Sequence, residues 1–112
     1  MNMIYKKSWK YILKHAFGSY YRPKALKNFK DVYKGDRGGY VKGYYNLSQT
    51  GNCWVYDEAI VSGDARVTED AVIRHTAQII NDAKISGDAE VIGDRKVQHD
   101  LSQLKECWIY DI

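Results

Sequence analysis

The chain has 112 residues and a mass of 12.9 kDa, which is enough for one domain with a hydrophobic core but too little for two. Two cysteines, 45% hydrophobic residues and no apolar run near the ~20 residues of a membrane span exclude a disulfide scaffold, a disordered chain and a membrane-spanning helix. The net charge of +3 hides two unlike parts: residues 1–42 hold 11 bases and two acids, a net +9, while the remainder holds six bases and 12 acids, a net −6. The beginning of the chain lacks the apolar stretch of a signal peptide, so we expect a cytoplasmic protein.

The N-terminal segment combines this positive charge with most of the aromatic residues. Apolar residues recur in it at spacings of four, three and four positions; they are Tyr5, Trp9, Ile12 and Ala16. This spacing predicts an amphipathic helix that ends before Gly18 and covers the first turn of the next domain. The stripe is short and rich in Tyr and Trp, so we expect no membrane contact.

The same segment is a candidate contact surface. Lys and Arg interleaved with aromatic residues are typical of surfaces that track phosphates and stack bases. For a protein partner or a nucleic acid, the predicted contact residues are Lys6, Lys7, Trp9, Lys10, Lys14, Arg22, Lys24, Lys27 and Lys30. No recognition motif accompanies them, and the acidic remainder of the chain repels phosphate, so nucleic-acid binding is kept as an alternative.

From Gly51 the chain falls into consecutive blocks of six residues that continue to Tyr110. The fifth position is Val or Ile in nine of ten blocks, and the third position is Ala in six consecutive blocks. These positions lie two apart, as on one face of a strand, whereas Gly, Asp, Asn or His at the first and second positions suits a tight turn. Each block therefore predicts a very short strand and a corner, and stacked blocks predict a solenoid with a β-branched interior.

A longer repeat supports this fold. The stretch 46–57 recurs at 100–111, an offset of 54 residues or nine blocks. With one block on each side of a triangular prism, the two copies lie three coils apart on the same faces. We therefore expect a β-helix of about four coils over residues 39–112, preceded by a basic, aromatic N-terminal domain, residues 1–38, that holds the helix and a lead-in segment.

These blocks resemble the hexapeptide-repeat proteins, and the resemblance implies a mainly β fold, a short left-handed parallel β-helix. A closer similarity, to phage and prophage proteins with GDA or GNA-x-V repeats, rests on segments 21–29, 31–32, 34–41, 46–48 and 51–57. Many of those proteins carry only a general description as transferases or polymer-forming proteins. The resemblance covers about residues 20–98 and implies a protein of the bacterial host's cytoplasm.

The fourth and sixth positions of a block are expected to point outward. On one face of the prism they carry apolar side chains, which usually mark an interface: Trp54, Tyr56, Val72, Ile92, Trp108 and Tyr110. Two alternatives explain this face. The N-terminal segment folds back over it, or copies of the chain associate through it as a dimer or trimer.

Catalytic and metal sites have little support. Some enzymes of the hexapeptide fold are acyltransferases with a histidine base, and His75 lies at a corner where such a base could act. However, the blocks run without an insertion that could form a substrate pocket. His75 and His99 fall on different faces, so no three-ligand metal cluster is expected, and no phosphate-binding loop or other cofactor motif is present.

The sequence therefore favours a non-catalytic β-helical protein–protein interaction module whose partners are a second copy and an unidentified host protein. From the resemblance and the small size we infer a phage-encoded inhibitor of a host nucleic-acid-targeting defence system. The alternatives are a small hexapeptide-type acyltransferase that uses His75 and a nucleic-acid-binding protein that uses the basic segment.

Overall fold

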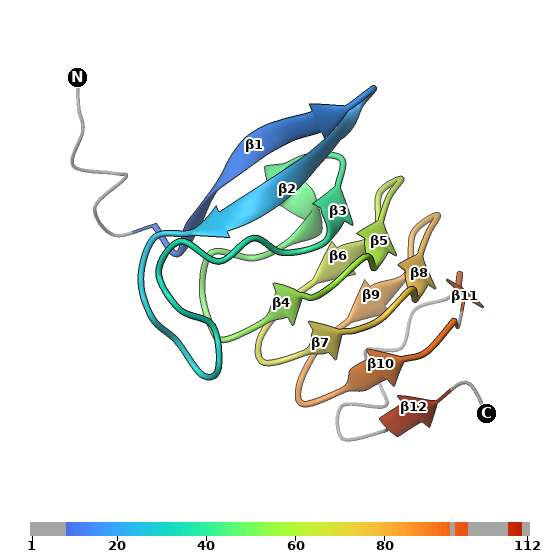
Figure 1. Ribbon diagram of the computed structural model, residues 1–112. Helices are drawn as coiled ribbons and strands as arrows, with labels where there is room; N and C mark the ends of the chain where they lie inside the picture. The colour runs from blue at the N-terminus through green and yellow to red at the C-terminus, as the bar shows by residue number, and fades with distance from the viewer. Residues whose placement is uncertain (1–8, 95, 99–107, 111–112) are drawn as a thin grey trace.

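The computed structural model, which describes residues 9–94, 96–98 and 108–110, is built of short β-strands (Figure 1). The repeats form a β-solenoid of about three turns, in which strands 18 residues apart pair in parallel. The six-residue period is confirmed, and the solenoid fits a hexapeptide-repeat β-helix.

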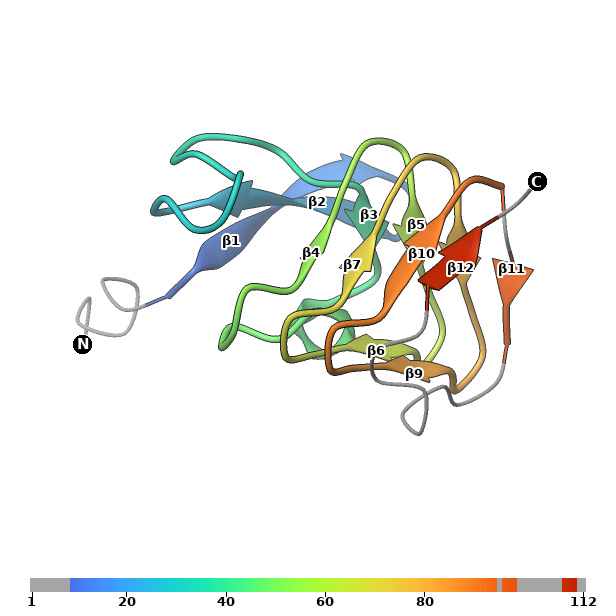
Figure 2. The same cartoon turned by 90° about the horizontal axis from the view of Figure 1, so that it is seen from below.

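Three faces make up the solenoid, and Figure 2 shows successive coils stacked along it. The first face holds β4 (Trp54–Val55), β7 (Val72–Ile73), β10 (Glu90–Ile92) and β12 (Trp108–Tyr110). The second holds β3 (Tyr40–Val41), β5 (Ile60–Val61), β8 (Gln78–Ile79) and β11 (Lys96–Val97). The third holds β6 (Arg66–Val67), β9 (Lys84–Ile85) and a bridge from Leu47 to Val67, which follows the 3-10 helix η1 (Tyr44–Asn46).

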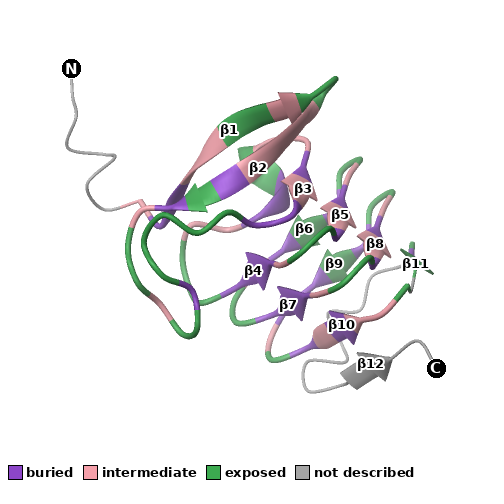
Figure 3. Ribbon diagram, in the orientation of Figure 1, coloured by how far each residue is buried: buried purple, intermediate pink, exposed green. Residues whose placement is uncertain are grey.

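The interior consists of the third and fifth block positions, as the pattern predicts. The six repeated alanines from Ala59 to Ala89 are at most 1% exposed, and the Val and Ile positions from Val55 to Val91 are fully buried. Figure 3 shows this buried line running from strand to strand. Because the coil is narrow, small and β-branched side chains are the ones that fill it without clashes.

The corners use the left-handed backbone that the first position predicts. At this position φ lies between 57° and 95° in all eight described blocks: Gly51, Asp57, Gly63, Glu69, His75, Asn81, Gly87 and Gly93. Glycine, asparagine and aspartate adopt this conformation most easily, which explains why they dominate the position.

The predicted N-terminal helix is wrong for the described residues. Residues 11–17 form β1 (Tyr11–Phe17), which pairs antiparallel with β2 (Tyr20–Ala25). A two-residue Gly-Ser connection between runs of aromatic and aliphatic residues favours a hairpin, and Gly18 has the positive φ, 53°, that such a turn needs. The hairpin pairs through β2 with β3, so it extends the second face beyond the first coil.

The lead-in segment, residues 26–38, returns from the hairpin across the first face and enters the first coil through Gly38 and Gly39 (Figure 1). A Cβ on Gly39 would lie 2.4 Å from the carbonyl oxygen of Ala59, and one on Gly38 would lie 2.5 Å from that of Val55. Only glycine permits this close approach, in which the Gly39 N–H donates to the Val55 carbonyl at 2.8 Å. We call the hairpin and the lead-in segment together the cap.

The expected number of coils differs from the observed one. The described residues make about three turns rather than four, and the stretch 99–107 that would complete a further coil lies outside them. Among the described residues no α-helix occurs, and no helix is long and apolar enough to cross a membrane.

Candidate binding surface

The cap is fixed to the solenoid by a polar side chain at an interior position. The Gln49 side chain accepts hydrogen bonds from the backbone N–H groups of Lys10, at 2.7 Å, and Tyr11, at 3.2 Å, and donates to the Tyr11 carbonyl at 3.0 Å. The Tyr11 hydroxyl donates to the Leu47 carbonyl at 2.5 Å, and burial raises the pKa of Tyr11. Hydrogen bonds from the first coil thus hold the beginning of β1, the outer strand of the hairpin.

Lys10 lies inside this junction and not on the surface where the sequence placed it. Its side chain is 1% exposed, and its Nζ donates to the carbonyl oxygens of Cys53, at 2.7 Å, and Gly51, at 3.3 Å. The Phe29 ring covers the ammonium at 5.2 Å from the ring centroid. Burial lowers the pKa of Lys10 and raises that of the Cys53 thiol. Lys10 is therefore enclosed by its own chain.

At the tip of the hairpin three aromatic rings gather and remain accessible. Phe17 lies 5.7 Å from Tyr20 and 5.4 Å from Tyr40, ring centroid to ring centroid, and is 56% exposed. The Arg22 guanidinium covers the Tyr40 ring at 4.6 Å, and the Lys42 ammonium covers the Tyr20 ring at 4.7 Å. We call these five residues the cap surface.

Arg22 holds this surface to the solenoid. Its guanidinium donates to the carbonyl oxygens of Gly38, at 2.8 Å, and Asp57, at 3.0 Å, and lies 3.5 Å from a carboxylate oxygen of Glu58. The Tyr40 hydroxyl donates to the other oxygen of Glu58 at 3.0 Å. Arg22 and Tyr40 thus both contact the solenoid corner at Asp57 and Glu58, and these contacts fix the position of the aromatic rings.

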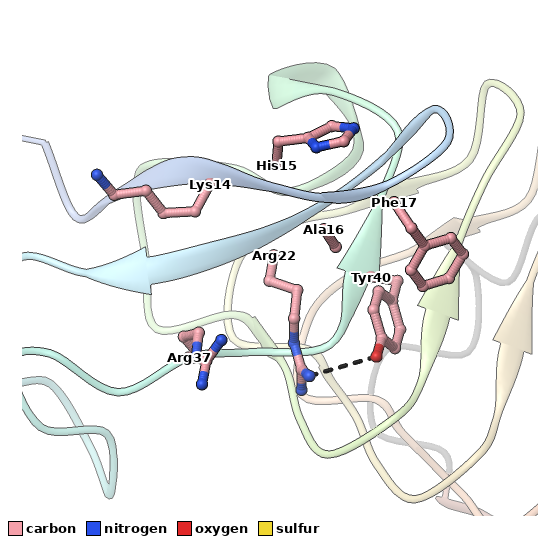
Figure 4. A pocket seen from close by; sticks show the side chains of 7 residues that line it. All are labelled: Lys14, His15, Ala16, Phe17, Arg22, Arg37 and Tyr40. Atoms are coloured by element: carbon pink, nitrogen blue, oxygen red, sulfur yellow. Dashed lines mark hydrogen bonds between the residues drawn. The ribbon is translucent and has the colours of Figure 1, made fainter.

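Beside the cap surface lies a basic cavity of about 270 Å³ (Figure 4). Its cations come from three segments: Lys14 from β1, Arg22 from β2 and Arg37 from the lead-in segment. Phe17 and Tyr40 line the same cavity, whereas the His15 ring points to the opposite side of the hairpin in Figure 4. The arrangement suits an anionic group that carries an apolar neighbour.

The predicted interface on the first face is partly covered by the lead-in segment. Trp54 is 1% exposed beneath Phe29, at 5.2 Å between centroids, and Val72 is also 1% exposed. Tyr56 is half-buried and donates its hydroxyl to Asp31 at 2.5 Å, while Ile92 is partly exposed. The side chains of Trp108 and Tyr110 lie outside the described part of the structure. A role of this face in contacts between chains stays a prediction.

The other predicted contact residues are spread over the cap. Lys6 and Lys7 lie outside the described residues, and Trp9 is half-buried against Tyr44 at 5.6 Å between ring centroids. The exposed members of the set are Lys14, Lys24, Lys27 and Lys30. The structure brings Lys14 and Arg22 together at one cavity and leaves the remaining lysines apart from it.

The sequence pattern did not point to five residues of this region: Phe17, Tyr20, Tyr40, Arg37 and Lys42. Their proximity depends on the hairpin and on its antiparallel pairing with β3, which brings residues some 20 positions apart into one cluster. The Gly18-Ser19 turn was the signal that could have revealed them.

His75 is exposed at a corner with φ of 63°, and its backbone N–H donates to an Asp57 carboxylate oxygen at 3.0 Å. Within the described residues its ring has no hydrogen-bond partner to orient it as a base. Those residues also contain no group of three or more His, Cys, Asp or Glu side chains that could hold a metal ion. His99 lies outside them.

Comparison with known proteins shows a partial similarity and assigns no family. No family model matches the chain. It is 45% identical over 42 residues to a protein of Escherichia coli (strain K12) described as uncharacterized acetyltransferase YdcK. That match covers 37% of this chain and only 13% of the length of YdcK.

Proposed function

We propose that the chain is a non-catalytic protein–protein interaction module in which the solenoid serves as a rigid support and the cap surface contacts the partner. The observation that carries the proposal is the aromatic cluster of the exposed Phe17 with the half-buried Tyr20 and Tyr40, over whose rings lie Lys42 and Arg22. Aromatic residues and arginine dominate the binding energy of protein interfaces, and a fixed cluster loses little entropy on binding.

The same contacts disfavour single-stranded nucleic acid as the partner. Base stacking needs an accessible ring face, but Tyr20 and Tyr40 are half-buried and each has a cation over one face of its ring. Glu58 also lies next to Arg22 and would repel a phosphate backbone. A protein partner with acidic and apolar side chains fits better.

Several finer features belong to this proposal. The left-handed coil, a phage origin, and inhibition of a host defence protein in the bacterial cytoplasm come from the sequence resemblance, whereas a fourth coil follows from the number of six-residue blocks. Dimer or trimer formation belongs here as well.

The test uses the full chain as bait in a bacterial extract. The double variant Phe17→Ser/Lys42→Glu alters the cap surface, and Tyr33→Ser is the matched control because Tyr33 is 65% exposed on the lead-in segment. We expect proteins that the wild-type chain and the control retain and that the double variant loses. Retention of the same proteins by all three baits, or specific retention by none, contradicts the proposal.

An acyltransferase is the second candidate, favoured by the partial match to a protein described as an acetyltransferase. In that case His75 would act as the general base, although its ring lies exposed without an orienting partner among the described residues. The test is acetyl-CoA with a panel of amines and alcohols, monitored by release of the free thiol. Release that His75→Ala abolishes and His15→Ala preserves would establish the enzyme and overturn the non-catalytic proposal.

A further inference from the structure

Two cations of the basic cavity have no counter-charge within the described part of the chain. Arg22, the third cation there, is committed to Glu58 and to two backbone carbonyls. Lys14 and Arg37 form no side-chain hydrogen bond or ion pair with any described residue, although both line the cavity. The Arg37 guanidinium offers a planar pair of donors and the Lys14 ammonium a point charge, and the two groups are directed apart in Figure 4, so they suit two neighbouring anions.

Two carboxylates elsewhere on the solenoid are likewise unpaired among the described residues. Asp64 and Asp82 occupy equivalent turns of successive coils, and the Asp64 N–H donates to the carbonyl of Asn81 at 2.8 Å. Both side chains are exposed. Stacked strands lie about 4.8 Å apart, so the two carboxylates form a close pair of like charges. Their repulsion is relieved when cations bind across them.

We infer that the chain associates with itself by placing the Asp64 and Asp82 turns of one copy into the Lys14–Arg37 cavity of another. The inference rests on the proposed function, since it names a partner for the region of the cap surface. Two free cations meet two free carboxylates, and Phe17 at the rim of the cavity gives the contact an apolar edge. Complementary charges of this kind steer the encounter of two copies and fix their relative orientation.

A nucleic acid is the competing occupant of the cavity. Asp57 and Glu58 lie at the border of the cavity through their contacts with Arg22. A nucleic acid carries several phosphates in a row, and those beyond the cavity would lie against these acids and be repelled. The carboxylates of Asp64 and Asp82 lie on neighbouring turns and can enter the cavity without approaching these acids, so we favour the second copy.

Sedimentation of the full chain at low and high salt tests the inference. We expect association that weakens as salt rises, because exposed charges are screened. The variants Lys14→Glu/Arg37→Glu and Asp64→Lys/Asp82→Lys should each weaken it by about tenfold or more, since like charges then face one another. An equimolar mixture of the two variants should restore a complex, because each supplies the charge that the other has lost.

Matched controls change the same charges outside the proposed contact. Lys27→Glu/Lys34→Glu alters two exposed lysines of the lead-in segment, and Asp88→Lys alters an exposed acid at a different corner. We expect both controls to associate as the wild-type chain does. A wild-type chain that stays monomeric at every concentration and salt, or a mixture that fails to restore association, overturns the inference.

The outcome separates this inference from the proposed function. If the wild-type chain is monomeric but still retains a protein that Phe17→Ser/Lys42→Glu loses, the self-contact fails and the interaction module stands. If the chain neither associates nor retains a protein, both fail. Binding of single-stranded DNA that Lys14→Glu/Arg37→Glu abolishes, without self-association, assigns the cavity to nucleic acid and also overturns the inference.

Discussion

The Nζ of Lys10 lies 2.7 Å from the carbonyl oxygen of Cys53 and 3.3 Å from its Sγ, at the junction between the cap and the first coil. A lysine from the basic part of the chain is thus used to satisfy backbone acceptors at the open end of the solenoid. An ammonium can serve this purpose at a coil end because several acceptors converge there, including the Gly51 carbonyl at 3.3 Å.

Replacing Lys10 by methionine should therefore destabilise the fold. Methionine keeps most of the side-chain volume but removes the donor, which leaves the Cys53 and Gly51 carbonyls without this partner. We expect a decrease of about 1–3 kcal/mol in the free energy of unfolding, measured by urea denaturation. Lys14→Met, at an exposed position, should change it by less than about 0.5 kcal/mol. Equal effects of the two substitutions would show that the buried hydrogen bonds contribute nothing.

Gln49 should be needed for docking of the hairpin, although the repeat would allow an aliphatic residue there. Gln49→Val removes both acceptor and donor from the backbone of Lys10 and Tyr11. We expect a loss of about 1–3 kcal/mol and faster hydrogen exchange of these two amides than of the solenoid amides. Gln78→Val, on the outer second face, is the control and should leave exchange in the cap unchanged. Uniform acceleration throughout the chain would contradict a local role.

The sequence predicts the solenoid well because each coil is decided by local chemistry. Alanine at the third position, Val or Ile at the fifth and a turn residue at the first repeat without interruption, and the structure places each as expected. The wrong expectation concerns the cap. A spacing of three and four positions in residues 5–16 suited a helix, but the Gly18-Ser19 turn and pairing with β3 favour a hairpin.

Outer surfaces are harder to predict because they depend on what folds back over them. Trp54 occupies an outward position of the repeat and is nevertheless covered by Phe29 of the lead-in segment. The sequence left this folding-back open as one of two explanations, and no local pattern chooses between them. Arg37 and Lys14 become neighbours only through the tertiary course of the chain, so the basic cavity could not be found from spacing.

Attachment of the lead-in segment to the first face should weaken in acid. Asp31 accepts the Tyr56 hydroxyl at 2.5 Å and lies 3.8 Å from Arg74. The Tyr56 hydrogen bond, with the Arg74 charge, holds the pKa of Asp31 below its ordinary value of 3.8. The folded state thus binds this proton more weakly than the unfolded state. The stabilisation is present above pH 3.8 and is lost as the pH falls through the lowered pKa.

Asp31→Asn tests this expectation in a Trp9→Phe/Trp108→Phe background, so that Trp54 is the only fluorescent tryptophan. At pH 7 we expect the variant to be less stable by under about 1 kcal/mol, because the carboxyl group is largely exposed. The difference from the parent should shrink toward zero in acid. Asp36→Asn, on the same segment, is the control. A difference that stays constant from pH 7 to pH 3 would exclude the carboxylate as its source.

The corner at His75 provides a test of conformational strain. His75 has φ of 63° and no hydrogen bond from its ring to a described residue. A left-handed backbone costs a non-glycine residue about 1–2 kcal/mol, and the entropy that glycine loses on folding offsets about 0.5–1 kcal/mol of that. His75→Gly should thus raise the free energy of unfolding slightly, by about 0.5 kcal/mol. Arg66→Gly, at an exposed strand position without positive φ, should lower it. Because the corner lies outside the cap surface, the His75→Gly chain should also retain the same proteins from an extract as the wild type; loss of that retention would place the corner in the binding surface.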